Sequence, residues 1–297
     1  MTVHHGSSKI IRPAGIGLVA FEHTDKWSVF DRGSSPQEIP GLGVSRADCA
    51  TASFAIACNA GIPTHYDSRP YARTLIVREF AVPGHDPLSG RTHGRVLPLE
   101  IIWRSTVEGS LLKRLDEGVI SPRDLGFAKG VSIRRGVRLP RLFIECTTKF
   151  ELVDRHVSIE EALDIAQISV GEWEQCTGLI QKLVPLLITA YRDLGFDLLD
   201  GKFEMAQHRD GSFLFVDVFG TQDENRIVRI IDGEPYCKDL LRMHPSIIRW
   251  RSELEEVKKE YPDDKSRWPQ YPILPESFLS RVARRYRSVG RVYGASV

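Results

Sequence analysis

The stretch 196–226, FDLLDGKFEMAQHRDGSFLFVDVFGTQDENR, constrains the fold more than any other part of this sequence. Two runs rich in apolar and aromatic residues flank the pair Asp210-Gly211, which is a strong short-range signal for a β-hairpin. If these two residues form the turn, Glu204 lies directly opposite Asp217. Side chains alternate between the two faces of a strand, so one face is predicted to be charged, with Asp200, Lys202, Glu204 and Asp217 beside Phe215 and Phe219. The other face is predicted to be apolar and buried, with Leu199, Phe203, Met205, Leu214, Val216 and Val218.

The predicted pairing of Glu204 with Asp217 matters chemically, because two carboxylates placed opposite each other repel. A protein tolerates such a pair where a cation lies between the carboxylates or where the face is in water. Two protein carboxylates together with substrate phosphates are a usual Mg²⁺ arrangement. The pattern alone leaves two interpretations open: a metal-binding face and an amphipathic hairpin whose charged face is solvated.

Composition excludes several classes of protein. The chain has 297 residues, 42% of them hydrophobic and 27% charged, which is enough for two domains or one large α/β domain. A net charge of +1 gives no bulk electrostatic reason to expect a nucleic-acid or membrane partner. The sequence has no signal-peptide core and no apolar run near the roughly 18 residues of a membrane span. Five cysteines, an odd number without a CxxC pair, suit free thiols and a cytoplasmic location.

The remaining pattern predicts a mixture of helices and strands. Helices are predicted at 46–59, 111–115, 170–194, 245–260 and 275–289, and strands at 16–21, 73–80, 95–103, 142–146 and 227–231. The strands 73–80 and 95–103 are expected to pair across a polar loop. Arg104 and Ser110, at the start of a predicted helix, indicate either an anion site or a surface arginine and a serine cap.

Four stretches, taken in order, resemble the signatures of a known family. They are GSSK at 6–9, PLEIIWRSTVEGSLLKRL at 98–115, CTTKFELVD at 146–154, and the pair DGKFE and VDVFGTQDENR within 200–226. Together they are similar to the motifs of SAICAR synthetase, the purine-pathway ligase that joins aspartate to carboxyaminoimidazole ribonucleotide (CAIR) and consumes ATP. The resemblance covers roughly residues 6–230.

The resemblance implies an α+β fold. It places an N-terminal antiparallel β domain at 1–97, a larger α/β domain at 98–297, and an ATP cleft between them. It also implies ATP and Mg²⁺ as cofactors and small molecules as partners: a carboxylate-bearing ribonucleotide and an amino acid such as aspartate. The sequence leaves a homo-oligomer open.

The resemblance further implies a role for particular residues. It assigns ATP to Ser8, Lys9, Lys202, Glu204 and the backbone near Val96. Glu204 and Asp217 are expected to hold Mg²⁺, and Lys202 and Asp200 to act in catalysis. The ribonucleotide is expected to contact Arg104, Ser110, Asp223 and Arg226.

These residue types suit the chemistry of amide formation. A carboxylate is a poor acyl donor, and transfer of the γ-phosphoryl group turns it into an acyl phosphate that an amine can attack. Phosphoryl transfer needs positioning and neutralisation of charge more than covalent help from the protein.

The chain also departs from the family pattern. The departures are Ser7, Val153, Met205-Ala206, Val218, Gln222, Glu224 and Asn225. Several of them fall near the sites where the family binds ribonucleotide and aspartate, so they bear on the substrate more than on the type of reaction. Three alternatives stay open: a divergent paralogue that amidates another heterocyclic carboxylate in specialised metabolism, a small-molecule kinase, and a nucleotide-binding protein without activity.

Overall fold

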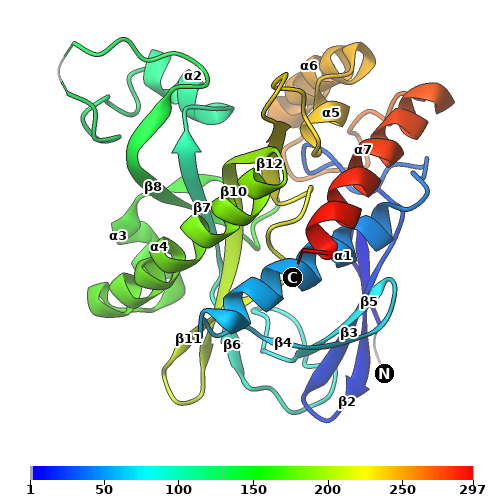
Figure 1. Ribbon diagram of the computed structural model, residues 1–297, viewed down its shortest axis with the longest axis vertical. Coiled ribbons are helices and arrows are strands. Elements are labelled where there is room, and N and C mark those ends of the chain that lie inside the picture. The colour runs from blue at the N-terminus through cyan, green and yellow to red at the C-terminus, as the bar shows by residue number, and fades with distance from the viewer. Residues whose placement is uncertain (1–2, 129, 297) are drawn as a thin grey trace.

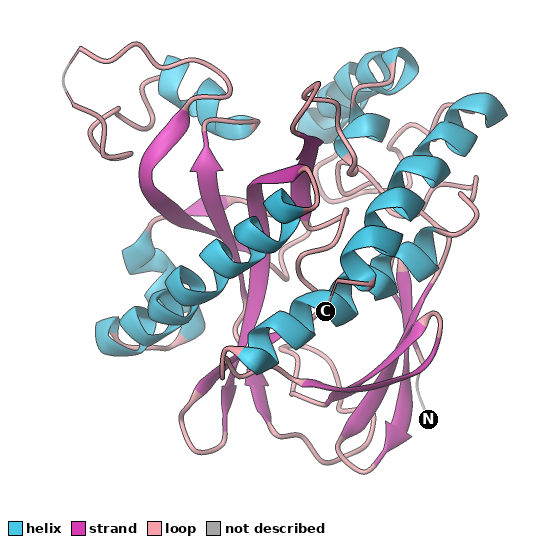
Figure 2. Cartoon of the chain, in the orientation of Figure 1, coloured by secondary structure: helices cyan, strands magenta, loops and turns pink. Residues whose placement is uncertain are grey.

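The computed structural model describes residues 3–128 and 130–296, and it contains two antiparallel sheets with helices packed around them (Figures 1 and 2). The first sheet has the strand order β1-β2-β3-β5-β4. Its strands are β1 (His4–His5), β2 (Lys9–Gly15), β3 (Leu18–His23), β4 (Tyr66–Tyr71) and β5 (Thr74–Arg78). All of these strands precede residue 97.

Helix α1 (Leu42–Asn59) packs on this sheet because both elements present an apolar face. Alternate residues of β3 and β5 are buried, among them Phe21 and Val77. Buried α1 residues recur every three or four positions: Ala47, Ala50, Phe54 and Ala57.

The second sheet is organised around the long strand β10 (Phe196–His208). Its order is β11-β10-β7-β8-β9, and β6 and β12 also pair with β10. The strands are β6 (Gly94–Val96), β7 (Leu99–Thr106), β8 (Arg138–Thr148), β9 (His156–Val157), β11 (Phe213–Val216) and β12 (Asn225–Arg229). Pro98, which has no N–H to donate, separates β6 from β7 in what the sequence indicated as one strand.

Helix α4 (Val170–Asp193) packs along β10, and its predicted apolar stripe is confirmed. The buried residues include Trp173, Ile180, Val184, Leu187 and Tyr191. A capping box of Ser169 and Glu172 begins the helix, which continues through Pro185. The other helices are α2 (Ser110–Asp116), α3 (Ile159–Ala166), α5 (Asp239–Arg242), α6 (Pro245–Glu260) and α7 (Glu276–Gly294). Within the described ranges, no helix combines the length and apolar character needed to cross a bilayer.

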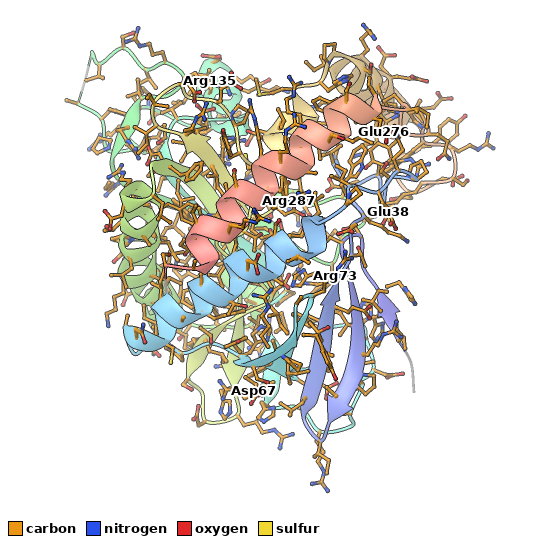
Figure 3. All side chains as sticks on the ribbon, turned by 45° about the vertical axis from the view of Figure 1, so that its right-hand side comes forward. Glu38, Asp67, Arg73, Arg135, Glu276 and Arg287 are labelled. Atoms are coloured by element: carbon orange, nitrogen blue, oxygen red, sulfur yellow. The ribbon has the colours of Figure 1, made fainter. Side chains whose placement is uncertain are left out.

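The C-terminal helices pack against the N-terminal part of the chain. Helix α7 lies along α1 (Figure 3), and Gly290 allows the close approach, since a Cβ there would lie 3.0 Å from the Cα of Ser45. A second apolar core joins Trp27 and Leu42 to Trp250 and Trp268 of the C-terminal region. Because these contacts join residues of both predicted domains, the predicted boundary at residue 97 stays a prediction. Residues 1–2, 129 and 297, which the predicted domains include, lie outside the described residues.

Two predicted pairings are wrong. Strand β5 lies between β3 and β4, so 73–80 does not pair with 95–103 beyond an isolated bridge from Ala81 to Arg95. In the hairpin, Glu204 lies opposite Val216 instead of Asp217. The loop has three residues, 209–211, and is closed by a hydrogen bond from the His208 N–H to the Ser212 carbonyl at 2.8 Å. The Asp210 carboxylate stabilises this turn by accepting hydrogen bonds from the backbone N–H and the hydroxyl of Ser212.

The one-residue change in register exchanges the faces of β11. Leu214 and Val216 now share the face of Glu204, whereas the ring of Phe215 packs on Phe203 with centroids 4.8 Å apart. Asp217 lies beyond the end of β11. Its carboxylate must therefore be placed by the turn that follows the strand.

Candidate active site

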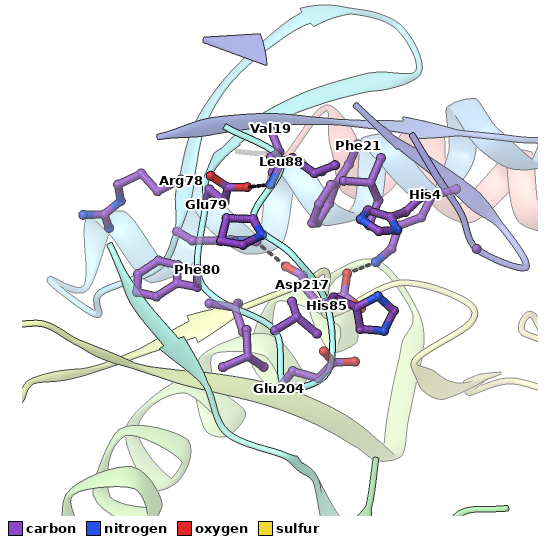
Figure 4. Close-up of a pocket in the computed structure, with 18 of the residues that line it drawn as sticks. His4, Val19, Phe21, Arg78, Glu79, Phe80, His85, Leu88, Glu204 and Asp217 are labelled. Carbon is purple, nitrogen blue, oxygen red and sulfur yellow. Dashed lines mark hydrogen bonds and ion pairs between the residues drawn. The ribbon is translucent and has the colours of Figure 1, made fainter. Parts of the chain in front are cut away.

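A cavity of about 380 Å³ lies between the two sheets (Figure 4). One wall comes from β2 and β3, with Lys9, Val19 and Phe21, and the opposite wall from β10 and the end of β11. The segment 79–88 closes one side, and Lys149 and Phe150 close another. One part of the lining is apolar and the other is charged. The cavity is therefore suited to a ligand with a flat apolar group and a charged tail.

The apolar part of the cavity includes Phe80, Val96 and Val216. Val96 contributes its side chain there, and its backbone N–H is already donated to the carbonyl of Ala81 at 2.8 Å. The predicted backbone role of Val96 toward adenine is therefore limited to its carbonyl. Gly6 and Lys9 of the predicted phosphate loop line the cavity, whereas the Ser8 carbonyl accepts a hydrogen bond from the N–H of Thr24.

Glu79 holds the loop that covers the apolar part of the cavity. Its buried carboxylate accepts hydrogen bonds from the backbone N–H of Leu88 and, at 3.1 Å, from that of Ser89 (Figure 4). The ring of His85 in this loop lies 5.3 Å from that of His4 and 6.5 Å from that of Phe150, measured between centroids. Three segments distant in sequence thus meet at one side of the cavity.

Two lysines line the charged part of the cavity with acidic side chains, and a third lysine, Lys202, lies next to the lining residue Glu204. Lys9 pairs with Asp217, and Lys149 pairs with Glu204. Lys202 pairs with Glu100 and lies 3.5 Å from Glu204 and 3.4 Å from Glu224. The structure therefore brings together Lys9, Lys202, Glu204 and Asp217, as the sequence predicted. Lys149 and Glu100 were not predicted to belong to the site, although Lys149 lies in the motif 146–154 and Glu100 in the motif 98–115.

Burial and neighbouring charges shift the pKa values of these groups. Burial lowers the pKa of Lys9 to about 8, because the acidic neighbours only partly compensate for lost hydration. Burial alone would raise the pKa of Glu204, but Lys149, Lys202 and Lys9 bring it down to about 2. Burial opposes the charge of Lys202, yet Glu224, Glu100 and Glu204 raise its pKa well above the ordinary value. Glu204 and Lys202 are therefore charged at neutral pH.

Asp217 has an unusual backbone conformation, with φ of 55°. A left-handed conformation costs a non-glycine residue roughly 1–2 kcal/mol, and residues that persist in it are often found at functional sites. The imidazole Nε2 of His65 lies 3.0 Å from the carbonyl oxygen of Asp217. Burial lowers the pKa of His65 to about 3, so this ring is neutral.

Glu204 and Asp217 have the donor atoms that Mg²⁺ prefers. Both line the cavity, and Oε1 of Glu204 is a buried oxygen that touches the Lys149 ammonium outside hydrogen-bond geometry. Across residues 3–128 and 130–296, no cluster of three or more histidine, cysteine or acidic side chains is arranged to hold a metal ion by itself. Glu204 and Asp217 are thus two oxygen donors that line the same cavity.

A second charged group lies farther along β10. Asp200 accepts hydrogen bonds from Arg104, at 3.3 Å, and from Arg226. Arg104 also donates to the Ser110 hydroxyl at 3.2 Å. Burial raises the pKa of Asp200, and Arg226 and Arg104 partly offset that effect. The predicted substrate residues Arg104, Ser110 and Arg226 thus meet at the predicted catalytic residue Asp200.

Gly109 keeps one side of this second group open. Its φ is 55°, and a Cβ at this position would lie 3.0 Å from a terminal nitrogen of Arg226. A side chain at position 109 would therefore cover the guanidinium that the sequence predicted to bind substrate.

Asp223, the remaining predicted substrate residue, lies elsewhere. Its carboxylate pairs with Arg46 at 2.8 Å and accepts a hydrogen bond from the hydroxyl of Tyr286 at 2.8 Å. Burial alone would raise its pKa, but Arg46 and Lys238 bring it down to about 2. The carboxylate is thus engaged with α1 and α7, so its predicted contact with ligand stays a prediction.

Comparisons with known proteins agree on one family. A family model described as SAICAR synthetase matches residues 3–261. The phosphoribosylaminoimidazole-succinocarboxamide synthase of Thermoplasma acidophilum is 30% identical over 292 residues, covering 96% of this chain and 95% of that protein. The SAICAR synthase from Saccharomyces cerevisiae complexed with SAICAR has a similar structure, with a TM-score of 0.73 at 17% identity over 99% of this chain and 95% of that chain. A SAICAR synthetase in complex with ADP has a TM-score of 0.68 at 22% identity over 91% of this chain and 100% of that chain.

Fold and site together define an α+β protein with a charged cavity between two antiparallel sheets. The match of the family model over most of the sequence shows that the chain belongs to the SAICAR synthetase family. It is accordingly an enzyme of the SAICAR synthetase type, and the predicted family and α+β fold are confirmed.

Proposed function

We propose that this enzyme uses ATP to join the carboxylate of CAIR to the amine of aspartate through an acyl phosphate. The observation that carries the proposal is the arrangement of Asp200, Lys202 and Glu204 at alternate positions on one face of β10. Glu204 lies at the cavity and Asp200 lies at the paired arginines. The two groups are separated by four residues, or about 13 Å of strand.

The cavity end is assigned to ATP. The apolar lining around Phe80, Val96 and Val216 would take adenine, and the ammonium groups of Lys9 and Lys202 would neutralise phosphate oxygens. Glu204 and Asp217 would hold Mg²⁺, which when bound supplies positive charge at the phosphates. A SAICAR synthetase of similar fold was solved in complex with ADP, which supports an adenine nucleotide as a ligand of this enzyme.

The arginine end is assigned to the phosphate of the ribonucleotide. Arg104, Ser110 and Arg226 converge there, and a guanidinium suits bidentate recognition of phosphate. Because a remote phosphate would be held at one end of β10, the reacting carboxylate would be kept near Lys202, beside the γ-phosphate. Asp200, which accepts hydrogen bonds from both arginines, orients this pair.

The reaction then needs two displacements. A carboxylate oxygen of CAIR attacks the γ-phosphorus, the bond to the bridging oxygen of ADP breaks, and ADP leaves with the electron pair. The neutral amine of aspartate attacks the acyl carbon, and inorganic phosphate leaves as the amide forms. Lys202 lies where it would stabilise the negative charge that is transferred between these groups.

The test is to incubate the enzyme with ATP, Mg²⁺, CAIR and aspartate, following ADP and detecting the succinocarboxamide by mass. Absence of ADP with this pair would contradict the proposal. ADP formation with a different heterocyclic acid in place of CAIR would indicate the divergent paralogue. ADP formation without any amine, together with a stable phosphorylated product, would indicate a kinase.

A further inference from the structure

The segment from Pro63 to His65 links the two sheets next to the cavity. The backbone N–H of Phe215 in β11 donates to the carbonyl of Pro63 at 3.0 Å, and the N–H of His65 donates to the carbonyl of Phe215 at 3.0 Å. On its other side, the carbonyl of His65 accepts from the N–H of Arg78 in β5 at 2.7 Å. These bonds connect β5 of the first sheet to β11 of the second.

The side chain of His65 extends from this link to Asp217. Its Nε2 lies 3.0 Å from the Asp217 carbonyl oxygen, and a carbonyl oxygen only accepts, so this nitrogen carries the proton. The imidazole is buried, and its ring centroid lies 5.6 Å from that of Phe21 and 5.9 Å from that of Phe54. The ring is therefore held in one orientation by backbone and by aromatic contacts.

The carbonyl that accepts the hydrogen bond from His65 belongs to Asp217, whose left-handed backbone conformation is unfavourable without stabilising contacts. Asp217 follows the last residue of β11 and has a φ of 55°. Rotation about the N–Cα bond of Asp217 would move its Cβ and its carbonyl group together, so a carbonyl held by His65 opposes any movement of the carboxylate away from Lys9. We propose that His65 is a positioning residue, which fixes the backbone of Asp217 so that its carboxylate points into the cavity. This inference rests on the proposed role of Asp217 toward a metal–nucleotide complex.

The test uses nucleotide binding, with ADP and a non-hydrolysable ATP analogue as probes. Calorimetry gives Kd in the presence of Mg²⁺ and in EDTA, and the ratio of the two values measures how much the metal strengthens binding. We expect His65→Leu to reduce this ratio by about 10- to 100-fold, the usual effect of removing a group that orients a metal ligand. His65→Gln retains an N–H donor and should restore most of the ratio. His244→Leu is the control, since His244 also contacts the backbone, by accepting a hydrogen bond from the N–H of Ser246, but does not line the cavity.

A double-mutant cycle with Asp217→Asn separates positioning from a general structural role. If His65 acts through Asp217, the loss in the double variant will be close to that of Asp217→Asn alone. The inference would be overturned if folded His65→Leu kept the wild-type ratio of the two Kd values. It would also be overturned if the loss in the double variant equalled the sum of the losses in the two single variants. If His65→Leu does not fold, His65→Met fills the same space without a donor and gives the same comparison.

The outcome also separates this inference from the proposed function. A wild-type enzyme that binds nucleotide equally well in Mg²⁺ and in EDTA would contradict the metal site itself. If Mg²⁺ strongly enhances nucleotide binding in the wild type and equally in His65→Leu, only the role of His65 is contradicted.

Discussion

The carboxylate of Asp223 and the guanidinium of Arg46 form a buried ion pair, with 2.8 Å between Oδ2 and Nε. Asp223 follows the β10–β11 hairpin, Arg46 belongs to α1, and Tyr286 of α7 donates its hydroxyl to the same carboxylate. A buried charge that loses its partner is costly. The pair therefore holds three elements of the chain together behind the cavity.

Asp223→Asn should lower the free energy of unfolding at pH 7 by roughly 2–4 kcal/mol. The folded-state pKa of about 2 lies below the ordinary 3.8, so the contribution of the ionised carboxylate is present above about pH 4 and is lost as pH falls toward 2. The difference between wild type and variant should narrow over that pH range. Urea titrations at pH 7, 4 and 3 measure it, and a constant difference would contradict the prediction.

Asp217→Asn should reduce Mg²⁺-dependent turnover by about 100-fold or more, as expected when one of two metal-binding carboxylates loses its charge. The fold should stay intact because, among the residues that the structure describes, this side chain pairs only with Lys9, and both line the cavity. ADP formation and thermal unfolding measure the two effects. Asp232→Asn, at an exposed turn, serves as the control. Near-normal turnover in Asp217→Asn would exclude the metal role.

Arg226→Lys should raise the KM for the ribonucleotide by about 10- to 100-fold, since a lysine cannot reproduce a bidentate contact with phosphate. The Kd for ADP should not change, because Arg226 does not line the cavity assigned to nucleotide. Steady-state kinetics and calorimetry measure the two quantities separately. If Arg226→Lys weakened the binding of the ribonucleotide and of ADP equally, the proposed assignment of one ligand to each end of β10 would be wrong.

Glu79→Gln should loosen the loop 83–94. The variant keeps one acceptor oxygen but weakens the charge-assisted hydrogen bonds to Leu88 and Ser89, at a cost of about 1–3 kcal/mol. Hydrogen exchange of this loop should accelerate by about tenfold or more, and the KM for ATP should rise. Exchange unchanged from wild type would mean that other contacts hold the loop.

Most of the helices and the identity of the charged residues could be predicted, because both depend on local signals. The periodic apolar stripe of α4 and the helix α6 at Pro245–Glu260 are examples. The motif residues Lys9, Lys202, Glu204 and Asp217 came from a family resemblance, and the structure brings them together.

The arrangement of those residues was harder to predict, because it depends on hydrogen bonds that the pattern does not contain. The Asp210–Ser212 turn added one residue to the hairpin loop, which shifted the register by one residue and left Asp217 beyond the end of β11. No local signal distinguishes a ligand-facing aspartate from Asp223, whose partner Arg46 lies 177 positions earlier in the chain. The role of His65 likewise depends on a contact made across 152 residues.

On the proposed assignment of the two ligands, strand β10 fixes the distance between the two reactants. Strands β6, β7, β11 and β12 hydrogen-bond along its two edges, so its backbone cannot stretch or slide without breaking several ladders at once. The separation between the metal-side carboxylate and the arginine pair is therefore a property of the main chain, not of any side chain. We therefore expect that substitutions around β10 can change which acid is accepted, but that every accepted acid spans the same distance between its phosphate and its reacting carboxylate.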